Sequence, residues 1–417
     1  MQSLNTFSSL DTSLRKNLTA IFWVGLFFWS SMSSQLPTIP LYIRSLTQSY
    51  DEIGMVMGSF AIGLLICRSY LGRVSDRKGR RYTMRIGLIV ATIIPLCYAV
   101  LPSIPLLMVC RAIHGISIAA FASSYSALIA DLAPLEKRGE IIGYMSLVNP
   151  LGLAFGPAIG GVIYEVWGYQ LLFVCASLFA LIGLILTTQI EAEGKVSDRE
   201  VSTAVKLGFW QTLLSPRVRV PSTVLLLVGL AFGTLSSFMP ILMEQKNMSL
   251  NAGVFYMAAA LSGFIIRFPV ARFSDVWGRG IFISIGICFY GISMIIIFFA
   301  SHDIAFLLSG IAEGIGAGIV IPSVIALLAD RTLPQERGYI FGMTWVGFDV
   351  GIALAGPIMG KMIGLVGITN IFAIATGICV LGLFVFCTQS NPTVAGSFKF
   401  AMGKSSDRYA IKSSASS

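Results

Sequence analysis

The stretch "YLGRVSDRKGRRYTMRIG" (Tyr70–Gly87) places a cluster of Lys and Arg residues around Asp76, between two long apolar segments. Such a cluster stands out in this chain, because 55% of the 417 residues are hydrophobic and only 12% are charged. The mean hydropathy of +0.82 is far above that of soluble proteins of this length. The composition therefore predicts a membrane protein.

Apolar windows of about 20 residues, the length needed to cross a hydrocarbon core of about 30 Å, recur along the whole chain. Because lipid offers backbone groups no water and no strand-like alternation is visible, each window is expected to be a helix. The sequence predicts an all-α membrane protein with twelve transmembrane helices in two pseudo-symmetric six-helix halves. The expected spans are 18–43, 53–73, 83–101, 104–130, 139–164, 169–189, 219–243, 250–271, 280–300, 303–329, 338–364 and 367–390.

The net charge of +9 is explained by membrane topology. With the N-terminus inside, all but four of the 29 Lys and Arg residues fall in or at the edges of cytoplasmic segments; the exceptions are Arg44, Lys246, Lys361 and, within a span, Arg111. In membrane proteins Lys and Arg are concentrated in the cytoplasmic segments, which accounts for the positive charge here. Nucleic acid is therefore not an expected partner. We expect a multi-pass protein of the plasma (inner) membrane, with the lipid bilayer around it and both termini cytoplasmic.

Enzymatic and metal-binding functions find no support in the sequence. The seven cysteines lie in or at the end of apolar spans without ligand spacing, which argues against disulfides and metal sites. No nucleotide-binding loop and no set of Ser, His and Asp in a catalytic pattern is present. The sequence therefore predicts no cofactor, no metal, no enzymatic activity and no ATP-driven pump.

A polar stretch after residue 187 divides the chain into two sets of spans. It contains the residues of an amphipathic, surface-lying segment around Val205–Leu214. The final residues are rich in Ser and Lys and are expected to be disordered. The predicted organisation is a cytoplasmic N-terminal segment (1–17), a first half (18–189), a cytoplasmic central loop (190–218), a second half (219–390) and a cytoplasmic tail (391–417).

The opening stretch occurs twice. A shift of 199 positions lays "CRSYLGRVSDRKGRR" on "IRFPVARFSDVWGRG", and it also lays "ADLAPLEKRGEIIG" on "ADRTLPQERGYIFG". Parallel six-helix repeats of this kind indicate a transporter whose substrate site lies between the halves at mid-membrane. The first match pairs Arg68, Arg73, Ser75, Asp76, Gly79 and Arg80 with Arg267, Arg272, Ser274, Asp275, Gly278 and Arg279.

Over residues 15–390 the chain resembles the major facilitator superfamily, and "GRVSDRKGRR" resembles the family's signature between helices 2 and 3. The resemblance implies that Asp76 meets the N-terminus of helix 11 when the cytoplasmic side is closed, and a helix N-terminus does stabilise a carboxylate. Arg80 would then hold the Asp76 rotamer. The alternative is that these charges only anchor the loop at lipid headgroups. The gating candidates are Gly72, Asp76, Arg77, Gly79, Arg80, Arg81, Asp275, Gly278 and Arg279.

Helix 5 carries "GYMSLVNPLGLAFGPAIGG", whose spacing resembles the antiporter signature of the drug:proton efflux branch. Glycines every four residues share one helix face and permit close approach of a neighbouring helix, and the proline removes a backbone donor. The resemblance implies efflux, whereas the plain alternative is that the glycines only pack. The residues concerned are Gly143, Gly152, Gly156, Pro157, Gly160 and Gly161.

Four titratable or charged residues fall inside predicted spans: Arg111, His114, Glu313 and Asp349. An ionised side chain at the bilayer centre costs at least about 2.5–3.5 kcal/mol, so each needs a reason. The family's helix 4 pattern implies a role for Arg111 in proton handling or substrate contact. His114 coincides with Glu313 under the 199 shift, and the resemblance implies that the two face one another across the cavity. Each could instead be a satisfied buried group.

The sequence thus favours a proton-coupled exporter of small apolar or amphipathic molecules that works by alternating access, with Glu313 ranked before Asp349 as the proton carrier. The partners expected are a small-molecule substrate and protons, and the chain is expected to be a monomer. The alternative is an uptake symporter or facilitator for a sugar or an organic anion, with Arg111 as the partner of the anion. A membrane enzyme or sensor built on the same bundle has no supporting motif.

Overall fold

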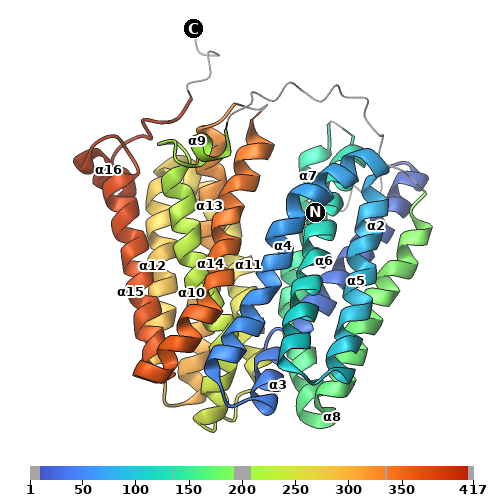
Figure 1. The fold of residues 1–417 in the computed structure, drawn as a ribbon. Helices are drawn as coiled ribbons and strands as arrows, with labels where there is room; N and C mark the ends of the chain where they lie inside the picture. The colour runs from blue at the N-terminus through green and yellow to red at the C-terminus, as the bar shows by residue number, and fades with distance from the viewer. Residues whose placement is uncertain (1–9, 135, 192–207, 334–335, 412–417) are drawn as a thin grey trace. The chain divides into compact units, whose positions relative to one another are not determined.

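The computed structural model describes residues 10–134, 136–191, 208–333 and 336–411, and these residues form helices joined by short connections, with no β-strand among them (Figure 1). Ten helical segments in the described ranges are long and apolar enough to cross a membrane. The all-α membrane fold expected from the sequence is therefore confirmed. The chain divides into two compact units, unit 1 (1–49, 55–198 and 251–257) and unit 2 (50–54, 199–250 and 258–417).

In unit 1, the first helix packs along the longest one, α2 against α8, and α5 packs against both α6 and α8. Its buried core includes Phe28 and Phe121, whose rings stack with centroids 3.8 Å apart. The elements are α2 (Thr12–Ser34), α3 (Ile39–Leu46), α4 (Tyr50–Lys78, within this unit from Met55), α5 (Arg80–Val100), α6 (Ile104–Leu132), α7 (Arg138–Met145), α8 (Val148–Leu186) and the 3₁₀ turn η1 (Thr187–Gln189).

In unit 2, α10 packs against α14 and α15, and α12 packs against α13 and α15. The elements are α9 (Phe209–Leu213), α10 (Arg219–Gln245), α11 (Ala252–Trp277, within this unit from Ala258), α12 (Arg279–Phe299), α13 (Asp303–Asp330), α14 (Arg337–Val366), α15 (Asn370–Gln389) and α16 (Val394–Ala401). Of the amphipathic segment expected around Val205–Leu214, the first residues lie outside the described ranges, and α9 forms in the remainder.

Helix boundaries repeat at the shift of 199 positions that relates the two halves of the sequence. Helix α12 begins and ends 199 residues after α5, and α13 begins 199 residues after α6. The starts of α7 and α14 are related in the same way, but α14 is continuous where the first copy is broken between Met145 and Val148. The internal repeat is therefore present in the structure as well as in the amino-acid sequence.

Three expected spans have different boundaries in the structure. Helix α2 begins at Thr12, six residues before the start of the first expected span, because the Asp11 side chain caps it by accepting from the Ser13 amide at 3.2 Å. It ends at Ser34, and a separate helix, α3, follows. The expected spans 139–164 and 169–189 lie in one helical segment, Arg138–Gln189, which is interrupted between Met145 and Val148 and again at Gly168, whose φ of 80° is non-helical. The count of twelve remains a prediction.

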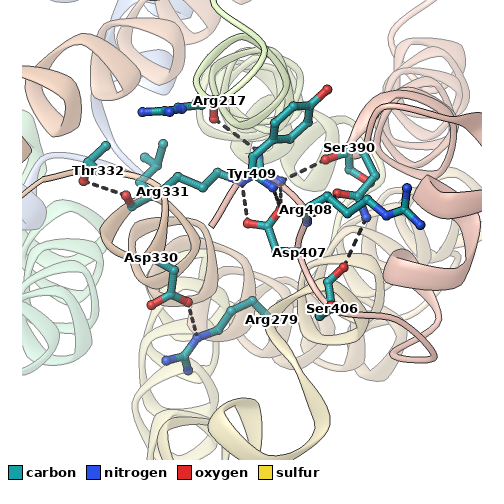
Figure 2. Close-up of polar contacts among 12 residues, drawn as sticks. Arg217, Arg279, Asp330, Arg331, Thr332, Ser390, Ser406, Asp407, Arg408 and Tyr409 are labelled. Atoms are coloured by element: carbon teal, nitrogen blue, oxygen red, sulfur yellow. Dashed lines mark hydrogen bonds and ion pairs between the residues drawn. The ribbon is translucent and has the colours of Figure 1, made fainter. Parts of the chain in front are cut away.

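The expectation of a disordered tail is wrong for residues 391–411. Thr393 caps α16 by accepting from the Gly396 amide at 3.1 Å, and the Ser284 hydroxyl on α12 donates to the Ala401 carbonyl at 3.0 Å. Further along, Arg331 donates to Asp407 at 2.7 and 2.9 Å (Figure 2). The tail folds because these bonds satisfy groups on α12 and at the end of α13. Residues 412–417 lie outside the described ranges.

Candidate functional site

The turn between α4 and α5 is reduced to one residue, Gly79. The sequence predicts a loop over Gly72–Arg81, but the residues up to Lys78 continue α4 and Arg80 already begins α5. Helix α4 continues to Lys78 because no residue before Gly79 stops it. Gly79 has a φ of 101°, which lies in the left-handed region that favours glycine. A Cβ at Gly79 would meet no atom within 4 Å, so backbone conformation is what requires the glycine.

Arg80 gathers the polar groups around this turn. Its guanidinium forms an ion pair with Asp76, one turn earlier on α4, and a second with Asp131 at the end of α6, with Nε 3.4 Å from Oδ2. It also donates to the Ser75 hydroxyl at 3.3 Å. Because the Asp76 side chain is 64% exposed, the Asp76–Arg80 pair contributes only about 0–1 kcal/mol to stability. Such a contact can be broken and remade at low cost.

The second copy builds the same turn in unit 2. Gly278 has a φ of 89°, and Arg279 lies with Nε 3.4 Å from the Asp330 carboxylate, the distance found in the first copy. Arg279 also donates to the Ser274 hydroxyl at 2.7 Å. Asp275 belongs to α11, and the prediction for its side chain lies outside what the structure describes.

The remaining basic residues of the first motif lie in different surroundings. Arg77 is exposed, and Lys78 lies over the Tyr82 ring at 5.6 Å. Arg81 instead donates to the Thr188 carbonyl at 3.3 Å, which ties the start of α5 to the turn η1 that follows α8. A contact between Asp76 and α14 would join the two units, and it remains a prediction.

The glycines of the expected antiporter signature lie against α2. A Cβ at Gly152 would overlap Trp29, one at Gly156 would overlap Ser33, and one at Gly160 would overlap the Ser34 backbone. The Ser33 hydroxyl donates to the Gly152 carbonyl at 2.7 Å, so the close approach is also hydrogen-bonded.

The other signature residues, Gly143, Pro157 and Gly161, have different surroundings. Gly143 lies on α7, and a Cβ there would meet nothing within 4 Å. Pro157 is buried inside α8, and a Cβ at Gly161 would overlap the Asn251 side chain. The shared face expected for Gly152, Gly156 and Gly160 is therefore present, and its partner is α2.

In unit 1, Arg111 and His114 belong to one buried polar cluster around Tyr98. The Tyr98 hydroxyl and His114 Nδ1 are 2.9 Å apart, and Arg111 lies near the Tyr98 hydroxyl. The Arg111 guanidinium lies 4.5 Å from the centre of the Phe60 ring, a cation–π contact. Arg111 Nε and His114 Nε2 are buried and have no hydrogen-bond partner in the structure. The cluster therefore retains unused donor and acceptor positions.

In unit 2, Glu313 on α13 is 6% exposed and lies near the Tyr290 hydroxyl of α12. Asp349 on α14 is 4% exposed. The acid at position 313 and the histidine at position 114, which coincide under the repeat, thus both lie near a tyrosine of the preceding long helix. Pairing between Arg111 and Glu313 would join the two units, and it remains a prediction.

Sequence reasoning missed three buried residues, namely the two tyrosines of these clusters and Arg331. Tyr98 and Tyr290 could have been found, because a hydroxyl within an apolar span needs a hydrogen-bond partner. Arg331 was assigned to a cytoplasmic loop, yet its side chain is fully buried. The internal repeat could have drawn attention to Arg331, because the corresponding residue of the first copy is Leu132.

Comparison with known proteins places this fold and these motifs in a family. The family model described as Major Facilitator Superfamily matches residues 21–279 and 264–408, so the chain belongs to the Major Facilitator Superfamily. Multidrug resistance protein 1 of Bacillus subtilis (strain 168) is 26% identical over 386 residues, which cover 91% of this chain and 98% of the relative. Quinolone resistance protein NorA of Staphylococcus aureus (strain COL) is 22% identical over 390 residues, with 91% and 97% covered.

Solved structures share the fold at lower sequence identity. The nucleoside transporter NupG superposes with a TM-score of 0.77 at 15% identity, covering 89% of this chain and 99% of that one. The human organic anion transporter MFSD10 superposes with a TM-score of 0.65 at 19% identity, covering 90% and 100%. The chain is a multi-pass membrane protein of the transporter fold.

Proposed function

We propose that this member of the superfamily is a secondary active transporter that exports small apolar or amphipathic molecules in exchange for protons, by alternating access of its two units. Both termini would lie in the cytoplasm, and the working form in the inner membrane would be the monomer. The observation that carries the proposal is the glycine face of α8, where Gly152, Gly156 and Gly160 lie directly on α2. This face follows the spacing that resembles the drug:proton antiporter signature.

Two further observations support export of such molecules. The relatives that align over nine-tenths of this chain bear the names multidrug resistance protein and quinolone resistance protein. In addition, each unit buries a titratable group near a tyrosine hydroxyl, His114 in unit 1 and Glu313 in unit 2. Buried titratable groups in membrane spans are costly and serve proton relays in pumps and transporters.

Glu313 is the proposed proton carrier, and Asp349 is the second candidate. Both carboxyl groups are buried within helices of unit 2. A carboxyl group enclosed by protein and lipid is favoured in its neutral form, so a change of surroundings during the cycle alters proton binding. Only a group of this kind can link release of substrate to uptake of a proton. Arg111 would favour the ionised form of Glu313 when these two side chains approach each other.

The test uses everted membrane vesicles, an imposed proton gradient and an amphipathic cationic dye such as ethidium. Wild-type protein should accumulate the dye only while the gradient is present. Glu313→Gln should still bind the dye, without dependence on pH, but should fail to accumulate it. Glu165→Gln, which neutralises an exposed carboxylate on α8, is the matched control and should accumulate the dye normally.

Other outcomes contradict specific parts of the proposal. Accumulation by Glu313→Gln together with failure of Asp349→Asn would reverse the ranking of the two acids. Accumulation by both variants would show that coupling uses another group or another ion. Gradient-driven movement of a sugar or organic anion in the opposite direction, with no dye accumulation, would favour the uptake alternative.

A further inference from the structure

A cavity of about 350 Å³ lies on unit 2, at the end of α11 that leads into Gly278. It is partly open, and it is lined by residues of α11, the start of α12 and the last turns of α13. Its polar lining consists of two arginines and two serines, Arg267, Ser274, Arg279 and Ser323, and its apolar lining includes Val270 and Pro322. None of these residues belongs to the proposed proton path.

The first copy of the repeat differs at the corresponding place. There the Ser124 hydroxyl donates to the Ser75 hydroxyl at 2.9 Å, which joins α6 to α4. The corresponding residues of unit 2 are Ser323 and Ser274, and both line the cavity. Ser323 is 2% exposed and its hydroxyl has no hydrogen-bond partner in the structure, whereas Ser274 accepts from Arg279. A buried hydroxyl without a partner is unfavourable, so this one is available to a ligand.

The charges on the cavity wall are positive. Arg279 is held by its ion pair with Asp330, which Figure 2 shows beside the tail. Arg267 is exposed, lies within the membrane-length window Ala252–Val270, and has no ion pair among the side chains that the structure describes. A cation in such a window needs a compensating anion, and the cavity provides the space for one.

We propose that this cavity binds a phosphate group. Two guanidinium groups and two hydroxyls offer several donors in a small space, which matches the oxygens of a phosphate and its charge. The volume also leaves space for a small attached group such as glycerol. Phe268 and Val276 of α11 are 64% and 75% exposed, so apolar surface for an acyl chain lies on the same helix. An anionic phospholipid headgroup and a free phosphate ester present the same chemistry.

The experiment titrates the purified full-length protein in a neutral detergent with glycerol 3-phosphate and with inorganic phosphate, by calorimetry. A second arm reconstitutes the protein in nanodiscs of phosphatidylcholine with or without phosphatidylglycerol, and it counts retained lipids by native mass spectrometry. Arg267→Gln and Ser323→Ala are the test variants. Arg68→Gln and Ser124→Ala, at the corresponding positions of unit 1, are the matched controls.

We expect Arg267→Gln to raise the Kd for the phosphate compound at least about tenfold, because a charge-assisted contact is lost. Ser323→Ala should raise it about threefold, since one neutral hydrogen bond is lost. Arg267→Lys should retain part of the affinity, which separates lost charge from misfolding. Binding only in the lipid arm identifies a phospholipid, and binding only in the calorimetric arm identifies a soluble ester; either supports the site.

Three results would overturn the proposal. The wild-type protein could bind no phosphate compound in either arm. Arg267→Gln could bind as tightly as the wild type. Arg68→Gln could lose as much affinity as Arg267→Gln, which would make the effect a general one of surface charge. None of these results depends on whether the protein exports drugs.

Discussion

Two buried arginines of this protein differ in how completely their hydrogen bonds are made. Arg331 in unit 2 is fully buried and bonds Asp407 through two nitrogens. It also donates to the Ser390 carbonyl at 2.9 Å and to the Arg217 carbonyl at 3.2 Å (Figure 2). Arg111 in unit 1 is 9% exposed, rests on the Phe60 ring, and leaves its Nε without a hydrogen bond.

The difference teaches how to separate structural charges from working ones. A buried charge with a bidentate carboxylate and further acceptors is fixed in one arrangement, and removing either member leaves the other uncompensated. Arg111 has no ion pair within the described residues. It can therefore acquire an anionic partner during the transport cycle without first breaking a buried ion pair.

The largest effect is expected from Arg331→Met. This change leaves the Asp407 carboxylate, whose side chain is 9% exposed, without its cation. We expect a loss of about 3–5 kcal/mol of stability, the usual result of breaking a buried ion pair. Thermal unfolding of the purified protein in detergent measures it. The control is Arg408→Ala, which removes an exposed cation of the same segment; equal losses in the two variants would refute the distinction.

Arg111→Met should leave stability nearly unchanged and should reduce transport. No buried carboxylate of the described part of unit 1 loses its ion-pair partner, so stability should stay within about 1 kcal/mol of the wild type. Gradient-driven transport should fall at least about tenfold, because removing a charged hydrogen bond is worth about 1.5–3 kcal/mol. Vesicle transport and thermal unfolding, measured on the same preparation, check the two statements. Unchanged transport would make Arg111 a structural residue like Arg331.

Tyr98→Phe tests the hydrogen bond between Tyr98 and His114 in the buried cluster that contains Arg111. The variant removes the 2.9 Å hydrogen bond to His114 Nδ1 while it keeps the ring that packs on Phe173. We expect a loss of about 1–3 kcal/mol of stability, since the histidine nitrogen remains buried without its partner. Tyr290→Phe, the tyrosine beside Glu313, is the matched variant of unit 2. If only the Tyr290 variant alters the pH dependence of transport, proton coupling belongs to unit 2.

The smallest stability effect is expected from Asp76→Asn, because its pair with Arg80 is largely exposed. The loss should be about 0–1 kcal/mol. Turnover should nevertheless slow, with little change in substrate affinity, if the carboxylate makes a contact in only one of the gating states. Initial transport rates at saturating substrate measure this. Transport at the wild-type rate would remove Asp76 from the gating role.

Much of the fold follows from local composition. The apolar windows predict where helices form, because a membrane span must satisfy its own backbone, and the structure has helices in those windows. The glycine spacing of α8 predicts a face for close packing for the same local reason. The boundaries that were wrong, at Thr12 and between Ser34 and Ile39, depend on capping and on interruptions that hydropathy does not report.

The candidate site is less accessible to sequence reasoning. Arg111, His114, Glu313 and Asp349 were identified because charges inside apolar spans are rare, and the structure buries all four. Their tyrosine partners were missed, because hydropathy gives a tyrosine no special weight within an apolar span. The one-residue turn at Gly79 was also missed, because charged residues can continue a helix beyond the membrane.

The sequence by itself determined the class of protein, the helical spans and the internal repeat, because these depend on local hydropathy and on similarity at a fixed shift of 199 positions. Only the tertiary structure decided which polar groups are satisfied. Asp407 reaches Arg331 across 76 positions, and Ser124 finds Ser75 although Ser323 has no such bond. Hydrogen bonds form over about 3 Å, and a linear sequence does not specify which distant residues come that close.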